Sequence, residues 1–105
     1  MAEVSKEIIE KVKKFIDLLE NYNIRINQAI LFGSYAKGNQ DKWSDIDLAI
    51  VSDDFIGDRY NDINKLKEFI FSIDTDISPL PFRIDEFTID NLFVKEIIQT
   101  GYRIV

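Results

Sequence analysis

The chain has 105 residues and contains neither cysteine nor histidine, so it cannot form disulfides, thiolate metal centres or a histidine general base. Any metal ion must therefore be held by oxygen ligands, which favours Mg²⁺ or Mn²⁺. Its formal net charge of −6 opposes binding to long nucleic acids, whose affinity rests on neutralised phosphates. The length and the 46 % hydrophobic content predict one globular domain over residues 1–105, and without a signal peptide or membrane-length apolar run we expect a cytoplasmic protein.

Apolar periodicity, turn residues and prolines divide the chain into seven expected elements, in the order helix, strand, strand, helix, strand, helix, strand. These elements are expected, in that order, at residues 4–19, 28–32, 45–51, 60–73, 76–80, 91–100 and 102–105. Pro79 and Pro81 predict that the third strand is an edge or ends there, because proline donates no hydrogen bond to a ladder. The order predicts a small α/β or α+β fold, with one mixed sheet and helices packed on one face.

Two aspartates at alternate positions begin the second strand. Asp45 and Asp47 point to one face, about 6–7 Å apart, and Ile46, Leu48 and Ile50 point to the other. Like charges this close repel each other, and a divalent cation between them would remove that cost. A solvated strand start would instead leave both as ordinary surface acids, and the pair alone does not decide between these interpretations.

A Gly-Ser pair precedes the first aspartate by ten residues. Gly33 allows a positive φ and lets the backbone approach a ligand closely, and Ser34 adds a hydroxyl donor. Backbone N–H groups that follow such a turn can bind phosphate oxygens. The pair gains meaning from the two carboxylates downstream, and together they indicate an enzyme that handles a nucleoside triphosphate.

A third carboxylate is expected from the next strand. Asp76 directly precedes an apolar strand, and Asp74 competes with it for the role. If this strand lies beside the second one, three carboxylates can surround two metal ions, which is the usual arrangement for in-line phosphoryl or nucleotidyl transfer. We prefer Asp76 because the apolar strand follows it immediately.

Several other side chains are candidates for supporting roles. Lys37, Lys42 and Arg83 can contact the triphosphate or the pyrophosphate, although each can also be ordinary solvated surface. Trp43 can stack on a base or simply pack. Five phenylalanines are interpreted as core residues, namely Phe15, Phe32, Phe69, Phe71 and Phe93.

The spacing from Gly33-Ser34 across ten residues to Asp45-Ile46-Asp47 resembles the signature of the DNA polymerase β-like nucleotidyltransferase superfamily. The small size, the leading helix and the ending GYRIV look like its minimal branch, the MNT proteins. The resemblance implies a nucleotidyltransferase fold. It also implies site roles: Gly33, Ser34 and Lys37 for the triphosphate, Asp45 and Asp47 for the metals, and Asp76 as a third metal ligand that helps deprotonate the nucleophile.

The same resemblance implies a partner and a reaction. Minimal proteins of this branch are paired with a HEPN-domain ribonuclease toxin in type VII toxin–antitoxin systems, and they transfer AMP from ATP to a tyrosine of the toxin. Two Mg²⁺ ions, ATP and a hetero-oligomer with the toxin are therefore expected. The chain has little length to spare for holding an acceptor, so an apolar surface on the last helix or on residues 84–93 is expected to contact the partner.

Two other functions remain open from the sequence. The chain can be an antitoxin that neutralises its partner by contact, with the acids only structural. It can also be a nucleotidyltransferase subunit that acts on RNA ends or on a small molecule such as an aminoglycoside. The acidic charge argues against long RNA, and the short chain argues against an enclosed small-molecule pocket.

Overall fold

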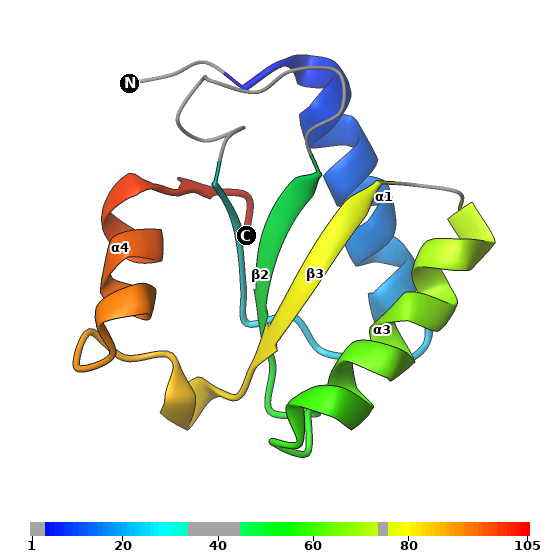
Figure 1. The fold of residues 1–105 in the computed structure, drawn as a ribbon. Coiled ribbons are helices and arrows are strands. Elements are labelled where there is room, and N and C mark those ends of the chain that lie inside the picture. The colour runs from blue at the N-terminus through cyan, green and yellow to red at the C-terminus, as the bar shows by residue number, and fades with distance from the viewer. Residues whose placement is uncertain (1–3, 34–44, 74–75) are drawn as a thin grey trace.

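The computed structural model describes residues 4–33, 45–73 and 76–105 of the chain (Figure 1). Within these residues the predicted order of helices and strands is confirmed, and a short 3-10 helix is added before the last helix. The elements are α1 (Lys6–Asn21), β1 (Gln28–Phe32), β2 (Ile46–Val51), α3 (Arg59–Ile73), β3 (Ile77–Phe82), η1 (Ile84–Glu86), α4 (Leu92–Thr100) and β4 (Tyr102–Arg103).

The strands form one mixed sheet in the order β3-β2-β1-β4. β1 is antiparallel to both β2 and β4, and β2 is parallel to β3. The end of β1 therefore lies beside the starts of β2 and β3, at the top in Figure 1. We call this end of the sheet, formed by Gly33, Asp45, Asp47 and Asp76, the acidic rim.

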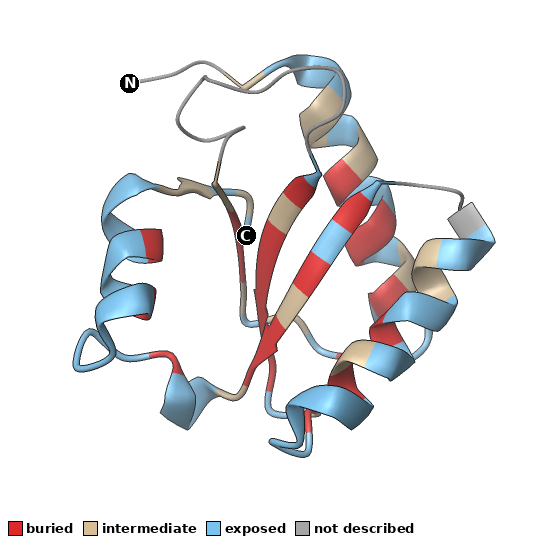
Figure 2. Ribbon diagram, viewed as in Figure 1, coloured by how far each residue is buried: buried red, intermediate tan, exposed pale blue. Residues whose placement is uncertain are grey.

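The helices cover both faces of the sheet, so the expectation that they pack on one face is wrong for α4. Helices α1 and α3 pack on the face that carries Leu48 and Ile50 of β2. Helix α4 packs on the face that carries Ala49 and Val51, on the other side of the sheet in Figure 1. The physical reason is that β2 is apolar on both faces after Asp47, as its nearly continuous burial in Figure 2 shows, so each face needs a cover.

Strand β3 is the edge strand that its prolines predict, but it continues through them to Phe82 rather than ending at Leu80. The carbonyl of Asp76 accepts a hydrogen bond from the Ile46 N–H of β2 at 3.1 Å, and the carbonyl of Phe82 accepts one at 2.9 Å from the N–H of Ser52, which directly follows β2. Residues at even positions therefore bond toward β2, and the prolines at odd positions face the free edge. There a missing N–H costs nothing and discourages pairing with another strand.

Helix α4 is capped at both ends, and its C-terminal end lies close to β1. The Asn91 side chain accepts hydrogen bonds from the N–H groups of Phe93 and Val94, at 2.9 and 3.3 Å. At the other end the Gly101 N–H donates to the Ile97 carbonyl at 2.8 Å. A β-carbon on Gly101 would collide with that carbonyl and with β1, so this glycine allows close approach of the helix end to the sheet.

Candidate active site

Gly33 and Asp47 lie against each other across the β1–β2 ladder. Gly33 follows Phe32, which is paired with Asp47 in register, and its φ is +74°. A β-carbon at Gly33 would overlap the carboxylate of Asp47. Two independent features therefore favour glycine here: the left-handed backbone and the neighbouring carboxylate.

Asp45 and Asp47 form a pair of interacting carboxylates at the start of β2. Burial raises the pKa of Asp47 above its ordinary value, and the charge of Asp45 raises it further. Asp47 is half-buried, whereas Asp45 is exposed at the rim. Among the described residues no cationic side chain pairs with either of them. The pair is thus a concentration of negative charge that the described part of the chain leaves unneutralised.

Asp76 lies beside this pair in the backbone. The residues that follow Asp45 and Asp76 are register partners on the parallel strands β2 and β3, and the Ile46 N–H donates to the Asp76 carbonyl at 3.1 Å. The Asp76 carboxylate, however, accepts a hydrogen bond and ion pair from Lys11 of α1 at 3.3 Å. Within residues 4–33, 45–73 and 76–105, no three acidic side chains are grouped closely enough to hold a metal ion.

The Asp45–Asp47 pair nevertheless fits a hard divalent cation. Mg²⁺ commonly takes one or two carboxylates from the protein and completes its shell with water and substrate phosphates, so a third carboxylate is not required to begin binding. The raised pKa of Asp47 indicates the electrostatic cost that such a cation would relieve. Asp45 and Asp47 are therefore the described residues that would hold the metal.

Two hollows open on opposite sides of the carboxylate pair. One, of about 250 Å³, lies between the end of β1 and α4, with Phe32, Gly33, Phe93 and Ile97 in its wall. The rings of Phe32 and Phe93 pack edge to face there, with their centroids 5.8 Å apart. The other hollow, of about 360 Å³, lies between β3 and α3 and has both Asp45 and Asp76 in its wall.

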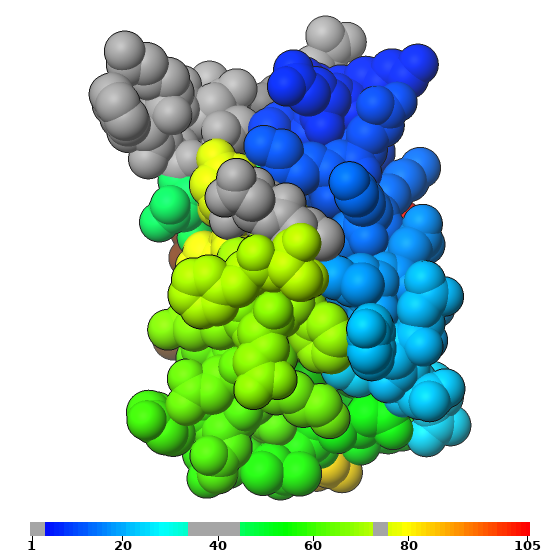
Figure 3. Space-filling view, turned by 90° about the vertical axis from the view of Figure 1, so that its right-hand side faces the viewer, coloured from blue at the N-terminus to red at the C-terminus, as the bar shows by residue number. Residues whose placement is uncertain are grey.

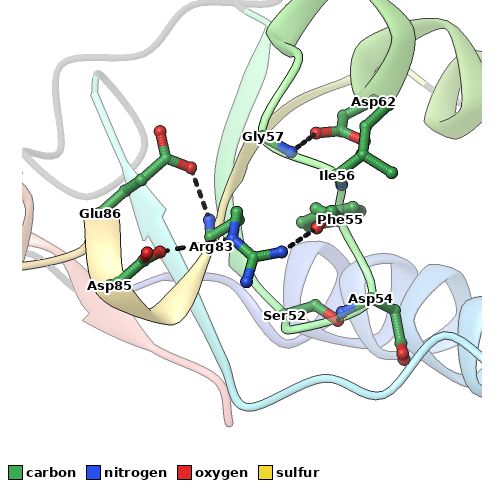
Figure 4. A network of polar contacts seen from close by, with 9 residues as sticks. All are labelled: Ser52, Asp54, Phe55, Ile56, Gly57, Asp62, Arg83, Asp85 and Glu86. Carbon is green, nitrogen blue, oxygen red and sulfur yellow. Dashed lines mark hydrogen bonds and ion pairs between the residues drawn. The ribbon is translucent and has the colours of Figure 1, made fainter.

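Arg83 does not belong to the acidic rim. It follows β3 at the end opposite Asp76, about 20 Å away along the strand. There its guanidinium donates to the Phe55 carbonyl at 2.5 Å and pairs with Asp85 at 3.4 Å (Figure 4). The prediction that Arg83 can contact a triphosphate at the acidic rim is therefore wrong, since the residue ties η1 to the loop after β2.

The same loop is held by a buried carboxylate from α3. Asp62 accepts hydrogen bonds from the N–H groups of Ile56 and Gly57 at 3.1 and 3.0 Å, as Figure 4 shows. Gly57 has a φ of +91°, so the turn also requires a residue that tolerates a left-handed backbone. This network is structural and lies away from the acidic rim.

The remaining predictions concern further site residues and the phenylalanines assigned to the core. Ser34, Lys37, Lys42, Trp43 and Asp74 lie outside the described residues. Of the phenylalanines assigned to the core, Phe15 is fully buried, but Phe71 and Phe93 are 83 % and 44 % exposed, so that assignment is wrong for both. For Phe71 the reason is that it stands about 140° around α3 from the buried Leu66, off the apolar stripe.

Sequence reasoning missed two side chains beside the acids. Lys11 pairs with Asp76 from 65 residues away, and Lys67 of α3 lines the hollow next to Asp45 and Asp76. Both are ordinary helix lysines in the sequence, and only the packing of α1 and α3 against the sheet places them here. No local pattern could have distinguished them from the other lysines.

The sequence matches a known family over almost its whole length. The model of the family described as "Nucleotidyltransferase domain" matches residues 6–105. Two similar proteins of Methanocaldococcus jannaschii bear the name "Putative protein adenylyltransferase", MJ0141 and MJ1379. MJ0141 is 30 % identical over 93 % of this chain and 99 % of its own length. MJ1379 is 33 % identical over 90 % of this chain and 87 % of its own length.

Solved structures with a similar fold come from toxin–antitoxin complexes. One is a toxin–antitoxin crystal structure with AMP-PNP, with a TM-score of 0.61 and 24 % identity over 89 % of this chain and 71 % of that one. Another contains a tri-AMPylated Shewanella oneidensis HEPN toxin with its MNT antitoxin, with a TM-score of 0.56 and 20 % identity over 96 % of this chain and 72 % of that one. These likenesses establish the fold.

No helix within the described residues is long and apolar enough to cross a membrane. With the family match extending over residues 6–105, the chain belongs to the nucleotidyltransferase domain family.

Proposed function

We propose that this chain is a Mg²⁺-dependent protein adenylyltransferase that moves AMP from ATP to a tyrosine hydroxyl of a HEPN-domain toxin and thereby acts as its antitoxin. The family match and the relatives named as adenylyltransferases support the reaction class. The structural neighbours, which are complexes of toxin and antitoxin, support the kind of partner. We place this activity in the cytoplasm, where ATP and Mg²⁺ are abundant, and expect a hetero-oligomer with the toxin.

The observation that carries the proposal is a carboxylate pair, which no cationic side chain among the described residues neutralises, beside a glycine with a left-handed backbone. Asp45 and Asp47 would hold two Mg²⁺ ions together with the phosphate oxygens of ATP. Gly33 leaves room for the triphosphate beside Asp47, and Ser34 and Lys37 would contribute further phosphate contacts. When bound, the metal ions neutralise charge on the triphosphate and lower the pKa of the attacking hydroxyl.

The reaction requires a base, and at the α-phosphorus of ATP one bond to oxygen forms while another breaks. The oxygen of the tyrosine hydroxyl forms a bond to the α-phosphorus of ATP, and the bond from that phosphorus to the bridging oxygen breaks. Pyrophosphate leaves with the electron pair of that bond. The hydroxyl proton passes to a carboxylate, for which Asp76 is the candidate because it stands next to Asp45 on the neighbouring strand.

A second function is favoured by one specific observation. The carboxylate of Asp76 is paired with Lys11, and the described residues contain no group of three acids around a common point. A chain that neutralises its partner by contact alone needs no such group. This alternative predicts that loss of the carboxylates leaves protection against the toxin intact.

Radiolabelled ATP decides between the two functions. The chain is incubated with Mg²⁺, ATP labelled in the α-phosphate and the purified HEPN-domain protein encoded beside it. We expect the wild type to transfer label to the toxin. In the double variant Asp45→Asn with Asp47→Asn, the rate of label transfer should fall at least about 100-fold, which corresponds to about 2.7 kcal/mol in activation free energy. Asp53→Asn, an exposed acid in the turn after β2, is the matched control and should transfer normally.

Protection of cells from the toxin is measured with the same variants. Loss of protection in the double variant supports catalysis as the mechanism. Absence of label transfer by the wild type, or full protection by a double variant that no longer transfers label, rejects the enzymatic proposal and leaves the contact mechanism. Undiminished label transfer by the double variant would instead remove Asp45 and Asp47 from the catalytic role.

A further inference from the structure

The hollow between β3 and α3 combines catalytic acids with an exposed aromatic side chain. Asp45 and Asp76 stand in its wall, at the starts of two neighbouring strands. Phe71 also lines it and leaves 83 % of its surface in solvent, although it is a large apolar residue. In Figure 3, α1 and α3 lie side by side across this face of the molecule, and the start of β3, in yellow, reaches the surface by the upper end of α3.

The position of this groove relative to Gly33 fixes which substrate it can receive. Gly33 lies on the β1 side of Asp47, and Asp76 lies on the β3 side of Asp45. In phosphoryl transfer the attacking and leaving oxygens stand roughly in line on opposite sides of the phosphorus. A triphosphate held at Gly33 therefore sends its leaving group toward β1, and the nucleophile must arrive from the side of β3 and α3.

The lining of the groove selects between kinds of nucleophile. Ile70, Phe71 and Pro79 supply apolar walls, and Lys67 is the cation among the lining residues, against the two acids. An RNA 3′ end would bring backbone phosphates to a chain whose formal net charge is −6, which opposes binding. An aromatic side chain with a terminal hydroxyl suits the same groove, because its ring packs on apolar walls while its oxygen reaches the acids.

We propose that this groove, lined by Lys67, Ile70, Phe71 and Pro79 and ending at Asp45 and Asp76, receives the acceptor tyrosine of a partner protein, with Phe71 packing against the partner. This inference rests on the proposed adenylyltransfer and adds the place where the acceptor docks. Its continuity with the acids distinguishes the groove from the other exposed apolar residues. Leu92 and Ile98 on α4, for example, are exposed but do not line this groove.

The test compares two exposed aromatic residues on one helix. Phe71 and Tyr60 stand near opposite ends of α3 and are 83 % and 75 % exposed, so Phe71→Glu and Tyr60→Glu should both leave the fold intact. We expect Phe71→Glu to raise the KM for the HEPN-domain acceptor at least about 10-fold, as loss of a central apolar anchor does. The KM for ATP and the affinity for ATP with Mg²⁺ should be unchanged, and Tyr60→Glu should behave as wild type.

Three results would overturn the inference. Phe71→Glu could transfer AMP to the protein acceptor as well as Tyr60→Glu does, which would remove Phe71 from the docking surface. It could weaken ATP binding to the same extent as acceptor use, which would assign the groove to the nucleotide. Labelling of an RNA oligonucleotide with a free 3′ hydroxyl, lost in Phe71→Glu, would assign the groove to RNA.

A photo-crosslinking experiment separates this inference from the proposed function. Phe71→p-benzoylphenylalanine and Tyr60→p-benzoylphenylalanine are each irradiated with the HEPN-domain protein, without ATP. A crosslink from position 71, and not from position 60, to the peptide that contains the acceptor tyrosine supports the groove even if no AMP transfer is found. AMP transfer without such a crosslink rejects the groove and leaves the proposed reaction standing.

Discussion

The carboxylate of Asp47 occupies the space that a β-carbon on Gly33 would fill. The glycine and the acid come from antiparallel strands, and each restricts the other: a side chain at position 33 would force the carboxylate of Asp47 to move. The contact brings the Gly-Ser pair and the two aspartates together, and it places a candidate metal ligand, Asp47, directly beside the glycine that we expect to approach phosphate.

Gly33→Ala should therefore damage both stability and function. The left-handed φ of +74° alone costs an alanine roughly 1–2 kcal/mol, and the overlap with Asp47 displaces the carboxylate. We expect a lower urea midpoint and at least about 10-fold weaker binding of ATP with Mg²⁺, measured by calorimetry.

Gly57→Ala is the matched control for that variant. Its φ of +91° imposes the same kind of strain, but its β-carbon would meet the Cδ of the Arg83 side chain at 3.2 Å, far from the acids. The control should lose stability and keep its affinity for ATP. Equal loss of ATP affinity in both variants would contradict the special role of Gly33.

Lys11 should compete with the metal for Asp76. Its ammonium holds the Asp76 carboxylate at 3.3 Å, and both side chains are substantially exposed, so the pair contributes little to stability. Lys11→Gln should leave the urea midpoint nearly unchanged and tighten Mn²⁺ binding several-fold, measured by electron paramagnetic resonance. Lys14→Gln makes the same charge change on an exposed position of α1 and controls for net charge. Equal tightening in both variants would show that the local pair does not matter.

The raised pKa of Asp47 predicts that this residue costs stability at neutral pH. Because the unfolded chain releases this proton first, the free energy of unfolding falls as pH rises above the ordinary value of 3.8. Asp47→Asn should therefore be more stable than wild type at pH 7, by less than about 1 kcal/mol for a half-buried group. Below pH 3.8, the ordinary pKa of an aspartate carboxyl, urea unfolding should show no gain in stability of Asp47→Asn over the wild type.

Two further measurements sharpen the Asp47 result. Asp53→Asn removes an exposed acid in the turn after β2 and should show no comparable gain. Mg²⁺ should stabilise the wild type and not Asp47→Asn, because a ligand that binds the folded chain raises its stability. A destabilised Asp47→Asn at pH 7 would indicate that the carboxylate has a stabilising partner instead.

Arg83 should matter for stability and not for nucleotide binding. Arg83→Met keeps most of the aliphatic stem but removes the donor to the Phe55 carbonyl and the partner of Asp85. We expect a loss of about 1–2 kcal/mol in the free energy of unfolding, because a partly buried carbonyl loses its hydrogen bond. The KM for ATP should not change. Arg103 is an exposed arginine on β4, and the control Arg103→Met should alter the free energy of unfolding by less than about 0.5 kcal/mol. A raised KM for ATP in Arg83→Met would contradict the purely structural role of Arg83.

The sequence by itself determined the elements, their order and the pairing of the central acids. Asp45 and Asp47 share a face because strand side chains alternate, and the glycine at position 33 follows from a strand that must turn. These are local constraints, so they can be read along the chain. Pro79 and Pro81 likewise predict an edge strand because each lacks a backbone donor.

Only the tertiary structure decided what stands around those acids. Periodicity identifies the apolar face of α4 but not which side of the sheet that face covers. The pairing of Lys11 with Asp76 and the place of Lys67 in the groove arise from packing between segments distant in the chain. Such contacts depend on how two helices dock on the sheet, which is a property of the whole core and not of any local pattern.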